Sequence, residues 1–277
     1  MVSQLGFCKA SLVGVNAERP TFFAKESHYW EDVSARGLLD VDEEVSKYLA
    51  LFPVEELSKC KAGFVDADPI FDYVAVPKCL EIFAPANLRS EFRFIVVLRE
   101  PVARDLSWYY HSKAGKLGSN PPCDAWDFDD YEAYADCLLT MDDKTILWRG
   151  AYAPQLRNWT QVFPRRHLIV IAMDSLLAPN QTALASITAF LGLTNTNHTI
   201  NLPHSNLHRL KEQDSISCDI VHRLQTYYDP YNKDLYSQLA SDHHQQLAPA
   251  DEPPFPPFKP FACAPIHQNS SFFPLKF

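Results

Sequence analysis

Residues 93–111, RFIVVLREPVARDLSWYYH, have types and spacings that could bind an anion. A short apolar run comes first, Arg99 follows it directly, and a helical pattern opens at Pro101. A guanidinium offers forked donors to a phosphate, and the hydroxyl of Ser107, two turns further on, offers another. The N–H groups of the helix end would add donors at the same place. The alternative is a surface arginine paired with Glu100 and a solvated serine.

The helical pattern after Pro101 has two faces. One is an apolar stripe formed by Val102, Leu106 and Tyr109. The other face carries residues at spacing i, i+3, i+4 and i+7, namely Arg104, Ser107, Trp108 and His111. We therefore expect the apolar stripe to be buried and Ser107 to face away from the core.

Strands and helices must alternate to position these residues. Short apolar runs at 94–98 and 167–173, and a weaker one at 64–65, predict buried strands. Amphipathic helices are predicted between and after them, at 101–113, 151–162 and 183–191, with Gly192 as a C-cap. This order predicts an α/β fold with a three-layer, doubly wound parallel sheet. Ligands of such sheets bind beyond the carboxyl ends of the strands.

The end of the chain has a different composition. Residues 251–265, DEPPFPPFKPFACAP, are rich in proline and have no regular apolar period. We expect an extended tail that wraps around the domain or dangles from it. The predicted division is one domain over 1–246 and a proline-rich C-terminal tail over 247–277.

Composition excludes several classes of protein. The net charge of -9 argues against a nucleic-acid partner, which needs a basic footprint. The sequence holds no run of about 18 apolar residues, as a membrane span requires, and its first ten residues are a poor signal peptide.

The cysteines indicate the compartment rather than a metal site. The seven cysteines form no C-x-x-C, and the histidines show no convergent spacing, so no metal site is predicted. An odd number means that at least one thiol stays free or pairs outside the chain, while one or two disulfides in a secretory compartment remain open. Four N-x-[ST] sequons favour a lumenal protein: Asn158, Asn180, Asn197 and Asn269.

The segment LREPVARDLSWYYH resembles the 3'-phosphate-binding strand and helix of sulfotransferases that use 3'-phosphoadenosine 5'-phosphosulfate (PAPS). Within these it is similar to the Golgi glycan sulfotransferases of the heparan sulfate type. The resemblance implies a sulfotransferase fold related to the P-loop NTPases. It also implies that Arg99 and Ser107 hold the 3'-phosphate of PAPS, and of its product 3'-phosphoadenosine 5'-phosphate (PAP).

Residues 25–30, KESHYW, resemble the segment of the same family that holds its general base. The resemblance implies that Glu26 takes a proton from the acceptor, and that Lys25 and His28 contact the acceptor. A surface or capping glutamate is the alternative reading of Glu26.

Further segments resemble the family in the same order, so that the likeness covers about 25–239. Residues 64–69 are similar to its second strand and turn, although Ala67 stands where some branches carry lysine. Residues 150–163 and 168–193 resemble its later helix and strand, and 224–239 resemble its terminal helix pair.

The phosphosulfate-binding loop of the family, P-K-x-G-T-[TS], is not recognisable in this sequence. No strand pattern precedes Lys9, and we do not assign the loop's role to that lysine. The expectation is therefore a fold that lacks its first strand. The chain would be a truncated product without its membrane anchor, or a degenerate relative.

The resemblance implies transfer of a sulfuryl group from PAPS to a hydroxyl or amine of a glycan in the Golgi lumen. The alternative is an inactive relative, a pseudoenzyme that binds a nucleotide or a glycan. A P-loop phosphotransferase would need G-x-x-x-x-G-K-[ST], which the sequence does not contain. The acidic net charge makes a neutral or lightly charged glycan at least as suitable an acceptor as a sulfated polyanion.

Overall fold

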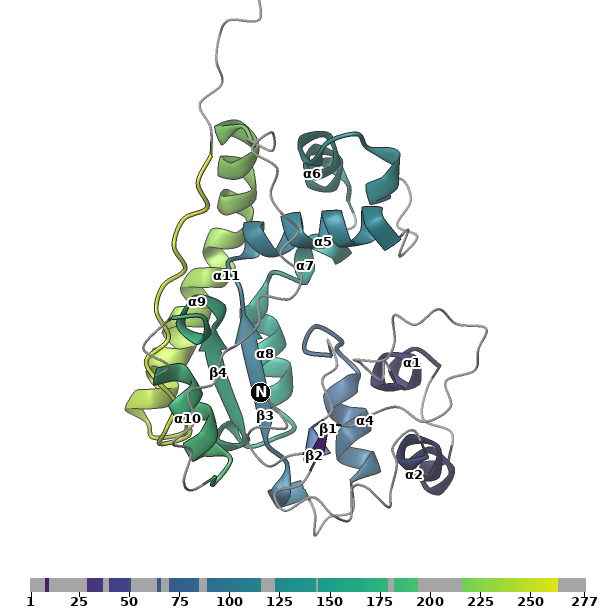
Figure 1. The fold of residues 1–277 in the computed structure, drawn as a ribbon, viewed down its shortest axis with the longest axis vertical. Helices are drawn as coiled ribbons and strands as arrows, with labels where there is room; N and C mark the ends of the chain where they lie inside the picture. The colour runs from purple at the N-terminus through teal and green to yellow at the C-terminus, as the bar shows by residue number, and fades with distance from the viewer. Residues whose placement is uncertain are drawn as a thin grey trace, which may run out of the picture. The chain divides into compact units, whose positions relative to one another are not determined.

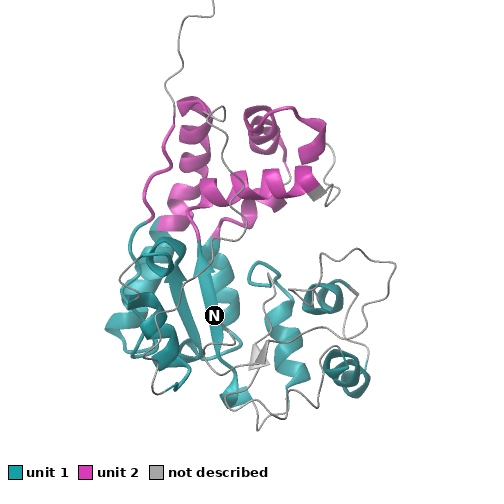
Figure 2. Ribbon diagram, in the orientation of Figure 1, with its two compact units in different colours: residues 1–98, 152–203, 233–257 teal, residues 99–151, 204–232, 258–277 magenta. Residues whose placement is uncertain are grey.

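The computed structural model describes ten parts of the 277-residue chain: residues 8–9, 29–36, 40–50, 64–65, 70–84, 89–115, 123–142, 144–178, 182–193 and 216–263. The chain divides into two compact units, shown in Figure 2. Unit 1 comprises Met1–Leu98, Tyr152–Pro203 and Lys233–Pro257. Unit 2 comprises Arg99–Ala151, His204–Asn232 and Phe258–Phe277.

The strands of unit 1 are parallel, and the α/β class expected from the sequence is confirmed (Figure 1). Strand β3 (Phe94–Leu98) pairs with β4 (Leu168–Ala172), with Phe94 opposite Leu168 and Leu98 opposite Ala172. All five residues of β4 are buried, which explains why its sequence is continuously apolar rather than alternating.

A second parallel pair corrects one expectation from the sequence. Strand β1 (Cys8–Lys9) pairs with β2 (Phe64–Val65), so a strand does include Lys9. The expectation that no strand occurs there was wrong because two residues are too few to form a recognisable apolar run.

The helices of unit 1 begin with three that share an aromatic cluster. They are α1 (Tyr29–Arg36), α2 (Val41–Leu49) and α4 (Val76–Phe83). The rings of Trp30, Tyr48 and Phe83 have centroids 4.6–5.4 Å apart, one ring from each helix. Such ring pairs add to the stabilisation that comes from burying their area.

Two later helices of unit 1, α8 (Tyr152–Thr160) and α10 (Thr182–Phe190), match the predicted segments to within two residues. The short α9 (Met173–Leu176) was not predicted, and the 3-10 turns are η3 (Arg89–Glu91) and η5 (Arg165–His167). Gly192 ends α10 with a φ of 68°, and Leu193 N–H donates to the carbonyl of Thr188. Glycine reaches this left-handed conformation without a steric penalty, as the predicted C-cap requires.

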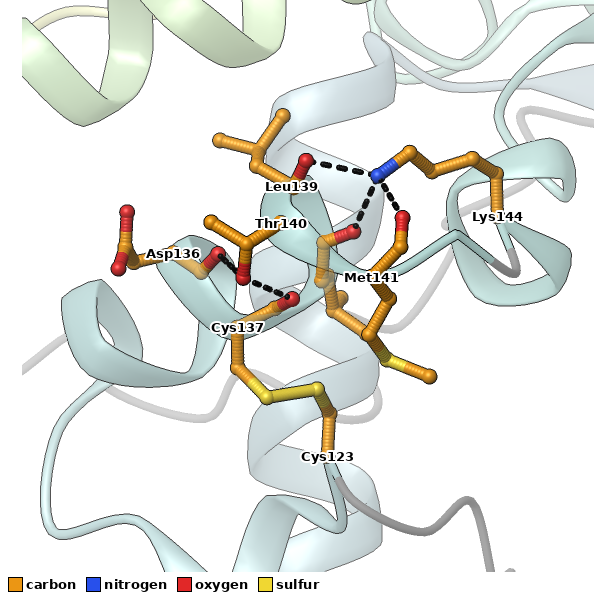
Figure 3. The surroundings of a disulfide bond; sticks show 8 residues. Cys123, Asp136, Cys137, Leu139, Thr140, Met141 and Lys144 are labelled. Carbon is orange, nitrogen blue, oxygen red and sulfur yellow. Dashed lines mark hydrogen bonds between the residues drawn. A yellow bond between two sulfur atoms is a disulfide. The ribbon is translucent and has the colours of Figure 1, made fainter.

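Unit 2 is helical and is held by a disulfide. It contains α5 (Pro101–Gly115), η4 (Ala125–Asp127), α6 (Tyr131–Thr140) and α7 (Thr145–Trp148). A bond between Cys123 and Cys137 ties η4 to α6. Lys144 closes the end of α6, because its ammonium donates to the carbonyls of Leu138, Leu139 and Met141 (Figure 3). The opposite end is capped by Asp130, whose side chain accepts from Ala133 N–H.

The last helix is α11 (Cys218–His244), one helix of 27 residues where the sequence resembled a helix pair. Pro230 lies inside it, and the helix continues past this proline. Tyr228 and Leu235 are buried as expected, whereas Tyr227 is only partly buried. None of the helices in the described ranges is long and apolar enough to cross a membrane.

The described part of the proline-rich segment after α11 is attached at several residues, among them Glu252 and Cys263. Glu252 is 6% exposed, and its carboxylate contacts Arg165 and the backbone of Val170 in unit 1. Cys263 forms a disulfide with Cys218, the first residue of α11, within unit 2. Of the two expectations, the described part of this segment wraps rather than dangles.

Candidate functional site

Arg99 and the helix that follows it form the first half of the candidate site. Arg99 comes directly after the last residue of β3, and α5 begins two residues later at Pro101. The predicted apolar stripe is confirmed, since Val102, Leu106 and Tyr109 are each at most 3% exposed. The buried stripe fixes which way the rest of α5 faces.

The opposite face of α5 gathers aromatic and cationic side chains. Ser107, Trp108 and His111 are all half-buried, and the rings of Trp108 and His111 lie 5.9 Å apart. The guanidinium carbon of Arg149, a residue from the turn after α7, lies 5.0 Å from the centre of the Trp108 ring. This distance is typical of a cation–π contact. Arg149 could not be found from local spacing, because it lies 41 positions after Trp108.

Arg104, predicted on the same polar face, is half-buried and contacts other groups of unit 2. Its Nη1 lies 2.9 Å from Oδ1 of Asp105 and 3.4 Å from the carbonyl oxygen of Ile146. Arg104 therefore has a structural role in unit 2.

The N-terminus of α5 is occupied by the chain's own carboxylate. The N–H of Ala103 donates to Oε2 of Glu100 at 2.7 Å. Burial raises the pKa of Glu100, while bonds from the Ala103 and Val102 N–H groups and the charge of Arg99 oppose the rise. The expectation that these N–H groups would serve an incoming anion is corrected. Anion donors at this position must be side chains.

A buried carboxyl in α5 was missed by the sequence analysis. Asp105 is 1% exposed, accepts a hydrogen bond from the hydroxyl of Tyr228 in α11, and pairs with Arg104. Burial raises its pKa to about 6, against the lowering effect of Arg104. Asp105 lies three residues after Val102 and four before Tyr109, and this helical spacing places it on the buried face of α5. The spacing could therefore have predicted its burial.

The ring of Tyr228 also packs against Gly150, the residue after Arg149. A Cβ at Gly150 would lie 2.7 Å from Cε1 of the Tyr228 ring, closer than real Cβ atoms come to such a neighbour. Glycine at this position therefore lets the chain beside Arg149 pack directly on the tyrosine.

The remaining predicted site residues, Lys25, Glu26 and His28, lie outside the described residues. Within the described ranges, His, Cys, Asp and Glu side chains form no group of three that could hold a metal ion.

The cysteines and one sequon can be placed. Two disulfides are present in unit 2, and Cys79 of α4 is a free thiol. Asn158 lies inside α8, and its Nδ2 donates to the carbonyl of Val74 at 2.9 Å. A glycan would be attached at that nitrogen, so this sequon is a poor acceptor in the folded chain. The other three lie outside the described residues.

The α/β architecture places an arginine at a strand end and a serine in the next helix, and a comparison with protein families gives the class of protein. The family model described as "Sulfotransferase domain" matches residues 31–251. The chain belongs to the sulfotransferase domain family.

Known proteins with similar sequences come from one group. Human heparan sulfate glucosamine 3-O-sulfotransferase 3B1 is 25% identical over 182 residues, 57% of this chain and 45% of the relative. Human bifunctional heparan sulfate N-deacetylase/N-sulfotransferase 2 is 25% identical over 153 residues, 53% of this chain and 16% of the relative. The chain thus spans less than half the length of these relatives.

Among solved structures, a sulfotransferase from Alicyclobacillus acidocaldarius is similar. It is 16% identical, covers 86% of this chain and 90% of its own, and has a TM-score of 0.49.

Proposed function

We propose that this protein transfers a sulfuryl group from PAPS to a hydroxyl or amine of a glycan in the Golgi lumen. Membership of the sulfotransferase domain family supports the reaction class. The names of the two human relatives, which act on heparan sulfate, support a glycan acceptor.

The observation that carries the proposal is the pair formed by Arg99 and Ser107. Both side chains belong to unit 2 and both are half-buried, one directly before α5 and one within it. The rise along the helix from Pro101 to Ser107 is about 9 Å, a gap that an arginine side chain and one phosphate can span. A guanidinium and a hydroxyl supply forked and single donors to phosphate oxygens.

The fit extends to the surroundings of this pair. Glu100 occupies the N–H groups at the N-terminus of α5, so the site relies on side-chain donors. Arg149 lies over Trp108 and places a second guanidinium on the face of α5 that carries Ser107. We assign Arg99 and Ser107 to the 3'-phosphate of the donor.

The chemical step would be carried by residues before α1. When bound, PAPS supplies the activated sulfuryl group. Glu26 accepts the proton that the acceptor hydroxyl or amine loses as its oxygen or nitrogen attacks sulfur. Lys25 and His28 contact the acceptor beside it.

The disulfides support the proposed compartment. Bonds such as Cys123–Cys137 and Cys218–Cys263 form and persist in oxidising compartments, including the secretory pathway. They are rare in proteins of the cytosol.

Thermal unfolding with nucleotides tests the donor site. PAP at about 100 times its Kd should stabilise the chain by about 2.7 kcal/mol and raise its Tm, and Arg99→Ala should abolish the rise. The matched control is Arg223→Ala, an arginine of unit 2 that pairs with Asp136 on the surface. Equal shifts with AMP would refute recognition of a 3'-phosphate.

Sulfuryl transfer from labelled PAPS to heparan sulfate-type oligosaccharides tests the reaction. Glu26→Gln should keep the PAP-induced Tm rise and lose transfer, whereas Glu43→Gln, an exposed glutamate of α2, should keep both. Turnover by Glu26→Gln would remove Glu26 from the mechanism. A Tm rise without transfer by the wild-type chain would favour the pseudoenzyme.

A further inference from the structure

The carboxyl of Asp105 joins α5 to another helix at the level of Ser107. It is buried and lies two residues before Ser107, so the two side chains project to opposite sides of α5. The hydroxyl of Tyr228 donates to Oδ2, and Arg104 Nη1 lies 2.9 Å from Oδ1. Both carboxylate oxygens are therefore held, one from α11 and one from α5 itself.

Tyr228 extends this connection to Arg149. Its ring is 1% exposed and packs against Gly150, where a Cβ would not fit. Gly150 is the neighbour of Arg149, and the guanidinium of Arg149 lies over Trp108, the residue after Ser107. These contacts therefore connect Asp105, on the buried side of α5, with Trp108 on its other face.

We propose that Asp105, acting through Tyr228 and Arg104, is a positioning residue that sets the rotation of α5 and so presents Ser107 to the 3'-phosphate of the donor. This inference rests on the proposed function. Asp105 itself touches neither substrate, because it is buried beneath the helix. Its hydrogen bonds decide where the opposite face of the helix points.

The same location makes the charge of Asp105 relevant to an anionic ligand. A carboxylate and a phosphate on opposite sides of one helix are roughly 10 Å apart, given the width of a helix with its side chains. At an effective dielectric constant near 20, unit like charges at that distance disfavour each other by about tenfold in affinity. Binding of the donor's phosphate should therefore favour the protonated form of Asp105.

The pH at which this matters follows from the surroundings of Asp105. Charged and titratable groups that interact with Asp105 come from α6, from α11 and from α5 with the residue before it: Tyr131 and Tyr134, Tyr227 and Tyr228, and Arg104 and Glu100. Asp124, before η4, and Arg149, after α7, act on the neighbouring Tyr134. The net effect is dominated by burial, which raises the pKa of Asp105 to about 6. PAP affinity should then include a component that falls as the pH rises through 6.

The test is the Kd of PAP for the full chain, measured by calorimetry between pH 5.5 and pH 7.5. PAP phosphates titrate in this range as well, so each variant is compared with the wild type at the same pH. Asp105→Asn removes the charge, keeps an oxygen acceptor for Arg104, and presents an amide N–H that the hydroxyl of Tyr228 can accept. We expect it to bind PAP like the wild type at pH 5.5 and up to about tenfold more tightly at pH 7.5.

Tyr228→Phe tests the positioning role separately from the charge. It keeps the ring against Gly150 and removes the hydroxyl, and we expect PAP binding about fivefold weaker at every pH. The matched controls are Tyr227→Phe, the neighbouring tyrosine of α11, and Asp136→Asn, an exposed aspartate of unit 2. Both controls should bind PAP as the wild type does.

The outcomes separate this inference from the proposed function. If PAP fails to bind the wild type, both are overturned. Two results would overturn only the positioning role, provided that PAP binds the wild type. One is that Tyr228→Phe binds PAP as tightly as the wild type. The other is that the ratio of the PAP Kd of the wild type to that of Asp105→Asn does not change with pH. A purely structural role would lower Tm in both variants without changing the pH dependence of PAP affinity.

Discussion

Replacing Glu252 with glutamine should destabilise unit 1 severely, although this residue lies in the proline-rich segment. The Glu252 side chain is 1% exposed, and Oε2 lies 2.7 Å from Nη2 of Arg165, whose side chain is 5% exposed. Oε1 accepts the backbone N–H of Val170, in the middle of β4. Burial raises the pKa of Glu252, and the charge of Arg165 opposes the rise.

The size of the effect follows from the burial of both partners. Removing one member of a buried ion pair costs about 3–5 kcal/mol, because the other charge is left buried and uncompensated. Arg165 keeps a second partner, since its Nε lies 2.9 Å from Asp242, and we therefore expect the lower end, about 3 kcal/mol. With a urea m-value of about 2–3 kcal/mol/M, the midpoint should fall by about 1 M.

Equilibrium urea unfolding, followed by tryptophan fluorescence, measures this difference. The matched control is Asp234→Asn, which removes a carboxylate from an ion pair with Arg157 in the same unit, 44% and 46% exposed. An exposed pair of this kind should change stability by less than about 1 kcal/mol. If Glu252→Gln is as stable as this control, the reasoning from burial is wrong and the segment does not support β4.

Two further predictions concern unit 2. Replacing Cys218 and Cys263 together by serine should cost about 4 kcal/mol in urea unfolding, because their bond closes 45 residues of chain; a loss below about 1 kcal/mol would contradict this. The pKa of Asp105 is raised from 3.8 to about 6, so the folded state retains a proton that the unfolded state loses in this window. The free energy of unfolding of the wild type should therefore fall by up to about 3 kcal/mol, relative to that of Asp105→Asn, from pH 4 to above pH 6. Parallel plots of unfolding free energy against pH for the two proteins would refute this prediction.

Local patterns predicted the elements well. The run at 168–172 could be recognised because a strand buried on both faces must be apolar throughout. The run at 94–98 has the same apolar pattern and is a strand, but the expectation of full burial was wrong there, since Val97 is 38% exposed. The stripe of α5 and the glycine cap at Gly192 followed from helical periodicity and from backbone conformation. Strand β1 was missed because its two residues carry no such pattern.

Long-range contacts could not be predicted in the same way. The partner of Arg165 is 87 residues away in a proline-rich run, where neither its identity nor its burial has a local signal. Seven cysteines allow many pairings, and the two disulfides of unit 2 depend on which loops meet. At the candidate site, the spacing of Arg99 and Ser107 left an anion site and a solvated surface pair as alternatives. The family resemblance assigned them to the donor, and that role stays a prediction. The hydrogen bond from Tyr228 to Asp105 joins residues 123 positions apart, so it could be found only from the folded structure.

The buried carboxylate of Glu252 also has a consequence for biosynthesis. A ribosome makes β3, β4 and the helices between them well before it makes residue 252. Until that residue emerges, Arg165 and the Val170 N–H lack the partner that they have in the folded chain. Domains generally fold in the order of synthesis, and this unit reaches its full stability only after its C-terminal segment is made. A nascent chain stalled before Glu252 should therefore be more sensitive to protease than the complete chain.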